Sequence, residues 1–203
     1  MKKLIWLPCL MLVVAVEVVS AQRASTESAG QPEVKKTGRG LEVNPEAAVL
    51  ADFQKRLADY QKLHDSVAKG SAELKETNDP AEIRRAQQTL ASRIREARKD
   101  ARPGDIFTPE IRAAFRRLMY PNLKGAEGKE TKATIKDDAP KGVPLKVNAS
   151  YPEGAPLPTM PANLLANLPR LPEDLEYRIV NRHLILRDVD ANIIVDFIPN
   201  AIR

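Results

Sequence analysis

The sequence predicts an α+β protein, in which a helical hairpin and a third helix precede a linker and a small C-terminal three-stranded antiparallel β meander with a short helix. Two patterns predict this class. Apolar residues recur at helical spacing between residues 45 and 121, whereas β-branched and aromatic residues recur at every second position between residues 169 and 202. Helices and strands therefore occupy separate parts of the chain instead of alternating.

The N-terminus has the three parts of a secretory signal peptide. Two lysines precede the apolar run LIWLPCLMLVVAVEVV, and small residues at positions 19 and 21 mark a cleavage site. We therefore expect residues 1–21 to be removed and the chain to be periplasmic or secreted, with no transmembrane span afterwards. An uncleaved anchor is the alternative. It is disfavoured because the run is shorter than the ~20 residues that a span needs and contains Glu17.

Composition limits the chemistry of the exported chain. Its single cysteine, Cys9, lies within the signal peptide, so we expect no disulfide and no thiol chemistry. Only 4% of residues are aromatic and 29% are charged, which predicts a small core. The net charge of +5 would suggest nucleic acid for a cytosolic protein, but export favours an envelope protein or an anionic envelope surface as partner.

The helical domain is predicted over residues 45–121, after a polar stretch at residues 22–44 that we expect to be a disordered tether. Asn44 and Pro45 are typical of a helix start, and Gly70 of a helix end. One apolar stripe follows helical spacing: Leu50, Phe53, Leu57, Tyr60, His64 and Val67. We interpret His64 as a partly buried, hydrogen-bonded member of this stripe, because a ligand or general base needs converging partners that the stripe does not offer.

A second helix is predicted to begin at Asp79-Pro80 and to end before Pro103-Gly104. Four arginines fall within about 60° of one another on its helical wheel. These are Arg84, Arg95, Arg98 and Arg102. We favour a solvated face in which the arginine stems cover apolar surface, and the alternative is a binding site for anionic envelope material.

The third helix is predicted to begin at Thr108-Pro109 and to end at Tyr120-Pro121. Residues 122–143 are rich in Lys, Glu and Gly, so we expect a flexible linker and a domain boundary there. The remaining residues, 144–203, form the predicted β module. Its elements are an edge strand at 144–151, a short helix at 161–168 and the meander.

The meander has two predicted turns. A two-residue loop at Asn181-Arg182 places Tyr177 opposite Leu186 and Glu176 opposite Arg187. A four-residue loop at residues 189–192 places Leu186 opposite Val195 and Leu184 opposite Phe197, which keeps the same apolar face. The second face is also fairly apolar. We expect the protein's own helices to cover it, and a partner protein is the alternative.

The run LEYRIVNRHLILRDVDANIIVDFIPNAI, with LPRLPED before it, resembles the C-terminal tail of uncharacterised exported bacterial proteins. The shared pattern is LPxLPxxLEYRxVxRxLILRDxxANxIVDxIxxA. This resemblance implies no activity.

The motif search favours a non-enzymatic envelope binding or accessory protein without a cofactor or metal. His64, Asp65 and Ser66 are consecutive, so on a helix they point 100° apart and do not converge as a catalytic triad. Asp188 and its neighbours begin like a calcium loop but lack its glycine and its glutamate, so we expect them to cap the hairpin turn instead. One alternative is a hydrolase-type enzyme with an acid/base pair from distant carboxylates: Asp105, Glu110 and Asp188. The other is an anionic-surface binder that uses the arginine strip.

Overall fold

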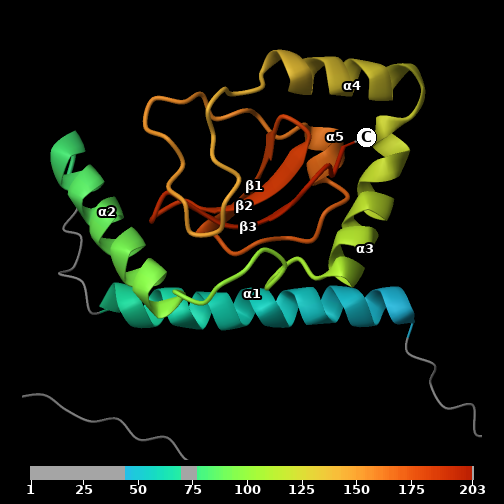
Figure 1. The fold of residues 1–203 in the computed structure, drawn as a ribbon. Helices are drawn as coiled ribbons and strands as arrows, with labels where there is room; N and C mark the ends of the chain where they lie inside the picture. The colour runs from blue at the N-terminus through green and yellow to red at the C-terminus, as the bar shows by residue number, and fades with distance from the viewer. Residues whose placement is uncertain (1–43, 70–76, 203) are drawn as a thin grey trace, which may run out of the picture. The chain divides into compact units, whose positions relative to one another are not determined.

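The computed structural model describes residues 44–69 and 77–202. The predicted signal peptide and nearly all of the predicted tether lie outside these residues. Within the described part, helices precede a three-stranded antiparallel sheet near the C-terminus, which confirms the predicted α+β class (Figure 1). None of the described helices is both long enough and apolar enough to cross a membrane.

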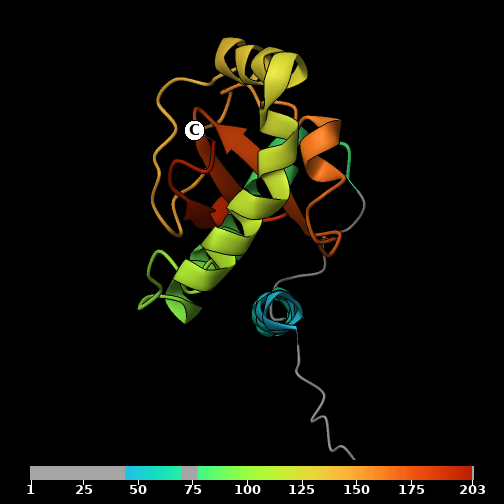
Figure 2. The ribbon, with the colours of Figure 1, turned by 90° about the vertical axis from the view of Figure 1, so that its right-hand side faces the viewer.

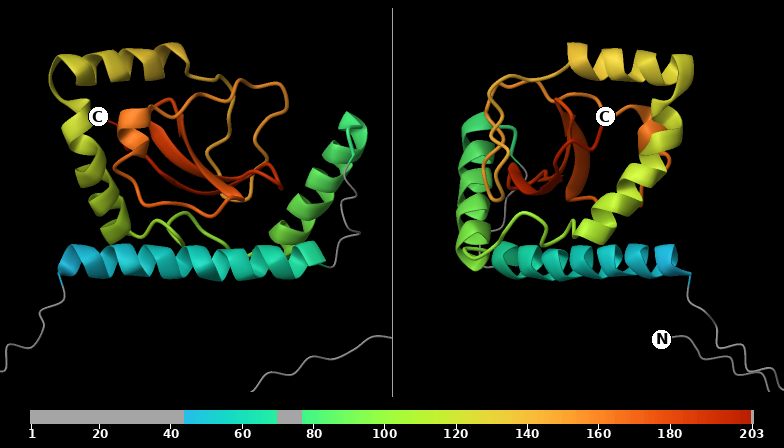
Figure 3. Two further views of the ribbon diagram at one scale, coloured as in Figure 1. Left: turned by 180° about the vertical axis from the view of Figure 1, so that it is seen from behind. Right: turned by 45° about the vertical axis from the view of Figure 1, so that its right-hand side comes forward.

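Three helices begin where the sequence predicts. They are α1 (Pro45–Lys69), α2 (Pro80–Ala97) and α3 (Pro109–Met119). In each, a polar residue before the proline accepts a hydrogen bond from a backbone N–H of the first turn. The last turn of α2 lies near the C-terminal end of α1, α3 begins toward the other end of α1, and the sheet lies between α2 and α3 (Figures 1 and 3). Figure 2 shows α1 end-on.

The first hairpin has the predicted register. Strands β1 (Leu175–Val180) and β2 (His183–Asp188) pair so that Tyr177 lies opposite Leu186. The turn between them needs a left-handed residue, and Asn181 supplies it with a φ of 57°.

The second hairpin differs from its predicted register. Its four-residue loop is as expected, but a bulge shifts β3 (Ile193–Ile198) so that Leu186 lies opposite Asp196 and Leu184 opposite Ile198. The predicted pairings with Val195 and Phe197 are therefore wrong.

Tertiary hydrogen bonds hold this bulge. The carbonyl of Val195 accepts hydrogen bonds of 3.2 and 3.3 Å from the guanidinium of Arg98. The buried carboxylate of Asp196 accepts hydrogen bonds from the backbone N–H groups of residues 104, 106 and 107. Neither contact follows from a period-two pattern, which explains the error in register.

The main core lies between the sheet and helices α1 and α3. Phe53, Phe107 and Phe115 pack ring against ring, with centroids 4.9 to 5.7 Å apart. Tyr177 of β1 extends this cluster from the sheet side. The core thus draws residues from both predicted domains, and Leu41–Arg203 forms one compact unit.

The second face of the sheet carries a smaller core, but helices do not cover it as expected. The segment 143–155 does, through Val143, Leu145 and Tyr151 packed on the sheet. The same segment joins the edge of β3 by backbone hydrogen bonds at Asn148, Ala149 and Tyr151, so the predicted edge strand is present as a single β-bridge.

The predicted linker at residues 122–143 is largely helical. A 3-10 turn, η1 (Tyr120–Leu123), leads into α4 (Gly125–Asp137). Gly128 lets the first turn of α4 lie against the backbone of Leu123, and Ile135 buries its side chain in the main core. Composition alone misses α4 because so few of its residues are apolar. The short helix α5 (Ala162–Leu165) falls within the predicted range.

Candidate metal centre at the end of α1

His64 lies near the C-terminal end of α1, on the buried face of the helix. Its side chain is only 6% exposed. Among the described residues, neither ring nitrogen has a hydrogen-bond partner. A buried imidazole in this condition is unusual, because burying a polar group without a partner costs free energy.

Three carboxylates nevertheless face this ring. The Nε2 atom lies 3.5 Å from Oδ2 of Asp188. On the other side, Nδ1 lies 3.6 Å from Oδ1 of Asp65 and 4.0 Å from Oδ2 of Asp174. Asp65 is the next residue of α1, Asp174 directly precedes β1, and Asp188 is the last residue of β2. The expectation that His64 lacks converging partners is therefore wrong.

Asp188 is held rigidly. Its carboxylate is fully buried and accepts a 2.6 Å hydrogen bond from the hydroxyl of Tyr60 and a 2.7 Å bond from the backbone N–H of Ala191. The second bond is the predicted turn cap. Burial, and then the charge of Asp188, raise the pKa of Tyr60 far above its ordinary value, so the phenol stays a donor.

The arrangement around His64 matches part of the pattern of a metal-ligating histidine. Such a histidine usually offers one ring nitrogen to the ion and directs the other at a carboxylate, which sets its tautomer and orientation. Here Asp188 is in position to orient Nε2. The Nδ1 atom and one oxygen each of Asp65 and Asp174 then lie within 4.8 Å of one another.

The cluster is open to solvent on the Nδ1 side. Asp174 is 31% exposed and Asp65 is 53% exposed. Zinc bonds of about 2.0 to 2.2 Å place ligand atoms roughly 3 to 3.5 Å apart, so the donors must move slightly closer. The exposed side chain of Asp65 has room to rotate, and water has access to the remaining positions.

The local charge is strongly negative. Burial, and then the charges of Asp174 and Asp188, raise the pKa of Asp190 above its ordinary value. Arg98 lies over the ring of Tyr60 at 5.1 Å and donates hydrogen bonds to the bulge of β3. A cation placed beside Nδ1 is therefore favoured electrostatically.

The four arginines of the predicted strip have two different environments. Helix α2 ends at Ala97, so Arg98 and Arg102 lie beyond it and the four do not share one helix face as predicted. Arg95 donates to the carbonyl of Asn148 and to Ser150, and Arg98 donates to Oδ1 of Asn148 and to the β3 bulge. Both therefore hold the segment 143–155 against the sheet. Arg84 and Arg102 are exposed.

The carboxylates of the predicted acid/base pair have separate surroundings. Asp188 is buried against Tyr60, whereas Glu110 is exposed on the first turn of α3. The carboxylate of Asp105 accepts a hydrogen bond from the backbone N–H of Arg102. Three cavities of about 260 to 700 Å³ in the described part of the chain are all lined by other residues.

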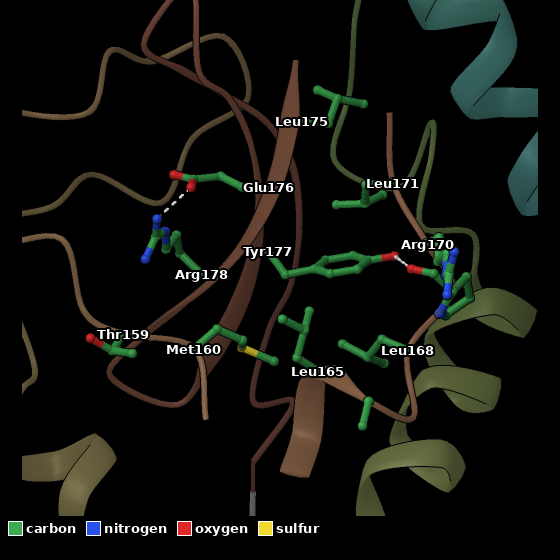
Figure 4. Close-up of a pocket in the computed structure, with 12 residues that line it drawn as sticks. Thr159, Met160, Leu165, Leu168, Arg170, Leu171, Leu175, Glu176, Tyr177 and Arg178 are labelled. Carbon is green, nitrogen blue, oxygen red and sulfur yellow. Dashed lines mark hydrogen bonds and ion pairs between the residues drawn. The ribbon is translucent and has the colours of Figure 1, made fainter. Parts of the chain in front are cut away.

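One of those cavities is a groove of about 700 Å³ beside β1 (Figure 4). Tyr177 lies across its middle and donates a hydrogen bond to the carbonyl of Pro169. At one side, Arg178 pairs with Glu176. The rest of the lining is mainly apolar.

Comparison with family models, with curated proteins and with solved structures finds no match for this chain. The chemistry of the His64 cluster is therefore inferred from its geometry.

Proposed function

We propose that this chain is an exported, non-enzymatic binding protein that takes up a divalent transition-metal ion at His64. The observation that carries the proposal is a buried imidazole with no hydrogen bond among the described residues, set between three carboxylates. His64 Nδ1, Asp65 and Asp174 are the proposed ligands. Asp188 is the proposed orienting carboxylate. The N-terminal sequence supports export.

The donor set favours one class of ion. A single imidazole with carboxylates and water suits Zn²⁺ and its neighbours in the first transition row. Calcium and magnesium prefer sites made of oxygen alone. We therefore propose Zn²⁺ or a similar borderline ion.

The competing interpretation is structural. In that interpretation His64 only packs between the carboxylates of Asp65, Asp174 and Asp188 and binds no ion. The acid/base enzyme is less well supported, because its three carboxylates have separate surroundings. The structural interpretation and the enzyme interpretation both predict that the protein does not bind metal at a fixed ratio per chain.

Isothermal titration of the purified exported chain with ZnCl₂ tests the proposal. We expect one Zn²⁺ per chain. His64→Gln and Asp174→Asn each remove a proposed ligand, and we expect each to weaken binding at least tenfold. The matched control is Asp59→Asn, because Asp59 is an exposed carboxylate on α1 that pairs with Lys55, outside the cluster.

A spectroscopic readout separates a metal ligand from a structural residue. Coordination through Nδ1 shifts that nitrogen in the NMR spectrum of the His64 ring, whereas an ion pair leaves the spectrum unchanged when zinc is added. Zinc binding that survives His64→Gln at full strength would contradict the proposal. The absence of zinc binding by the unsubstituted protein would also contradict the proposal.

A further inference from the structure

Helix α4 separates its charges by sign. At 100° per residue, Lys129, Lys132 and Lys136 fall within about 60° of one another on the helical wheel. The acids Glu127, Glu130 and Asp137 fall in a separate sector of about 80°. The helix therefore has one basic face and one acidic face. The two faces flank the outward direction, which is opposite the buried Ile135.

The basic face of α4 borders two small cavities. One, of about 260 Å³, has an apolar floor that includes Ile135 and Ile202, and its rim carries Lys132, Lys136 and Arg182. The other, of about 300 Å³, shares Lys132 and is lined also by Tyr120 and Leu123 of η1. The two cavities thus form one surface, in which cations surround apolar hollows.

Among the described residues, the side chains of Lys132, Lys136 and Arg182 make no ion pair and no hydrogen bond. The guanidinium groups of Arg95 and Arg98, by contrast, are committed to segment 143–155 and to β3. Lys132, Lys136 and Arg182 are therefore available to a partner, whereas two of the four arginines of the predicted strip are not.

An aromatic side chain completes this surface. Tyr120 is 57% exposed, and Lys124 lies over its ring at 4.0 Å. Tyrosine is favoured where apolar material meets water, because its ring is apolar and its hydroxyl is polar. An exposed tyrosine beside cations and apolar hollows matches the chemistry of a bilayer surface.

We propose that this surface docks on a bilayer that contains anionic phospholipids. Lys132, Lys136 and Arg182 contact the phosphates, and Tyr120 lies at the level of the headgroups. The hollows over Ile135 and Ile202 receive apolar parts of the lipid. Juxtamembrane cations each contribute about 1 kcal/mol, so three of them change the partition coefficient roughly 100-fold at physiological salt. The proposal is independent of the metal site.

Vesicle co-sedimentation measures this binding directly. The exported chain, from residue 22, is mixed with vesicles of 30% phosphatidylglycerol in phosphatidylcholine. We expect binding at low salt, no binding to pure phosphatidylcholine, and release at high salt. The combined variant Lys132→Gln, Lys136→Gln and Arg182→Gln should lose roughly 100-fold in partition coefficient. Its helicity should be unchanged, since Gln suits helices about as well as Lys.

The matched control removes the same charge from α2 and the segment that follows it. Arg84→Gln, Lys99→Gln and Arg102→Gln alter three exposed cations of that region. We expect this variant to retain most of its vesicle binding. Equal losses in the two variants would show that only net charge matters, or that α2 shares the contact, and would overturn the proposal.

A single-tryptophan variant tests the position of Tyr120. The only tryptophan of the chain, Trp6, lies in the predicted signal peptide, so Tyr120→Trp gives the exported chain a unique reporter. Its emission should shift to the blue when phosphatidylglycerol vesicles are added. An unshifted emission during demonstrated binding would overturn the proposal. Full competition by millimolar inorganic phosphate would do the same, since it would indicate a simple anion site.

Discussion

The hydroxyl of Tyr60 donates a 2.6 Å hydrogen bond to Oδ2 of Asp188, which joins the middle of α1 to the end of β2. The same oxygen lies 3.5 Å from Nε2 of His64. Tyr60 and His64 are four residues apart, one turn of α1. One buried carboxylate therefore joins the helix to the sheet and lies next to the proposed metal ligand.

This hydrogen bond makes a prediction for stability. Tyr60→Phe removes the donor and leaves a buried carboxylate short of one partner, so we expect a loss of about 1 to 3 kcal/mol in the free energy of unfolding. Urea denaturation followed by circular dichroism measures it. Tyr120→Phe is the control, because the side chain of Tyr120 is exposed. Equal midpoints for the two variants would show that the Tyr60 hydroxyl adds nothing.

A second buried carboxylate, Asp196, should matter more. It accepts hydrogen bonds of 2.8 to 3.0 Å from the backbone N–H groups of Gly104, Ile106 and Phe107. Asp196→Ala leaves these donors without a partner, and we expect a loss of at least about 3 kcal/mol. Asp196→Asn keeps an acceptor oxygen and should cost less. Urea denaturation that ranked Asn as the more damaging substitution would contradict this account.

Local rules predict much of the fold. A capping residue followed by proline locates the start of α1, α2 and α3, and Asn181 fixes the first hairpin, because these signals depend only on neighbouring residues. The β3 bulge depends instead on Arg98 and Asp196, whose partners are distant in sequence. Helix α4 escapes prediction for a similar reason, since its stability comes from packing and not from composition.

The sequence predicts two parts of the candidate site but not that they meet. The first hairpin register places Leu175 opposite Asp188, so Asp174 and Asp188 are neighbours as soon as that hairpin is accepted. The helical stripe places His64 on the buried face of α1. The sequence does not indicate which part of α1 docks on which end of the sheet. The docking of α1 on the sheet brings His64 to Asp174 and Asp188.

The pH dependence of stability should follow Glu176. Its carboxylate is partly buried, which by itself would raise its pKa, but hydrogen bonds from Arg178 and Arg187 outweigh burial and leave the pKa below its ordinary value of 4.5. A lowered folded-state pKa means that the stabilisation is present above pH 4.5 and is lost as the pH falls through the folded-state value. We expect Glu176→Gln to destabilise the protein at pH 7 and to have a smaller effect at pH 3. Denaturation at both pH values measures this difference, and a constant difference would contradict it.

Gly128 provides a test in which two physical effects oppose each other. In an exposed helix, replacing glycine by alanine stabilises by about 1 kcal/mol, because alanine loses less backbone entropy. At Gly128 an added Cβ would lie 2.2 Å from the backbone carbon of Leu123, so something must move. We expect Gly128→Ala to destabilise the protein and to loosen α4 from η1. Thermal unfolding gives the sign of the effect, and hydrogen exchange of the α4 amides shows where it acts. The control is Ala133→Gly, at an exposed position on α4, which should cost about the ordinary 1 kcal/mol. A stabilising Gly128→Ala would show that η1 does not pack tightly on α4.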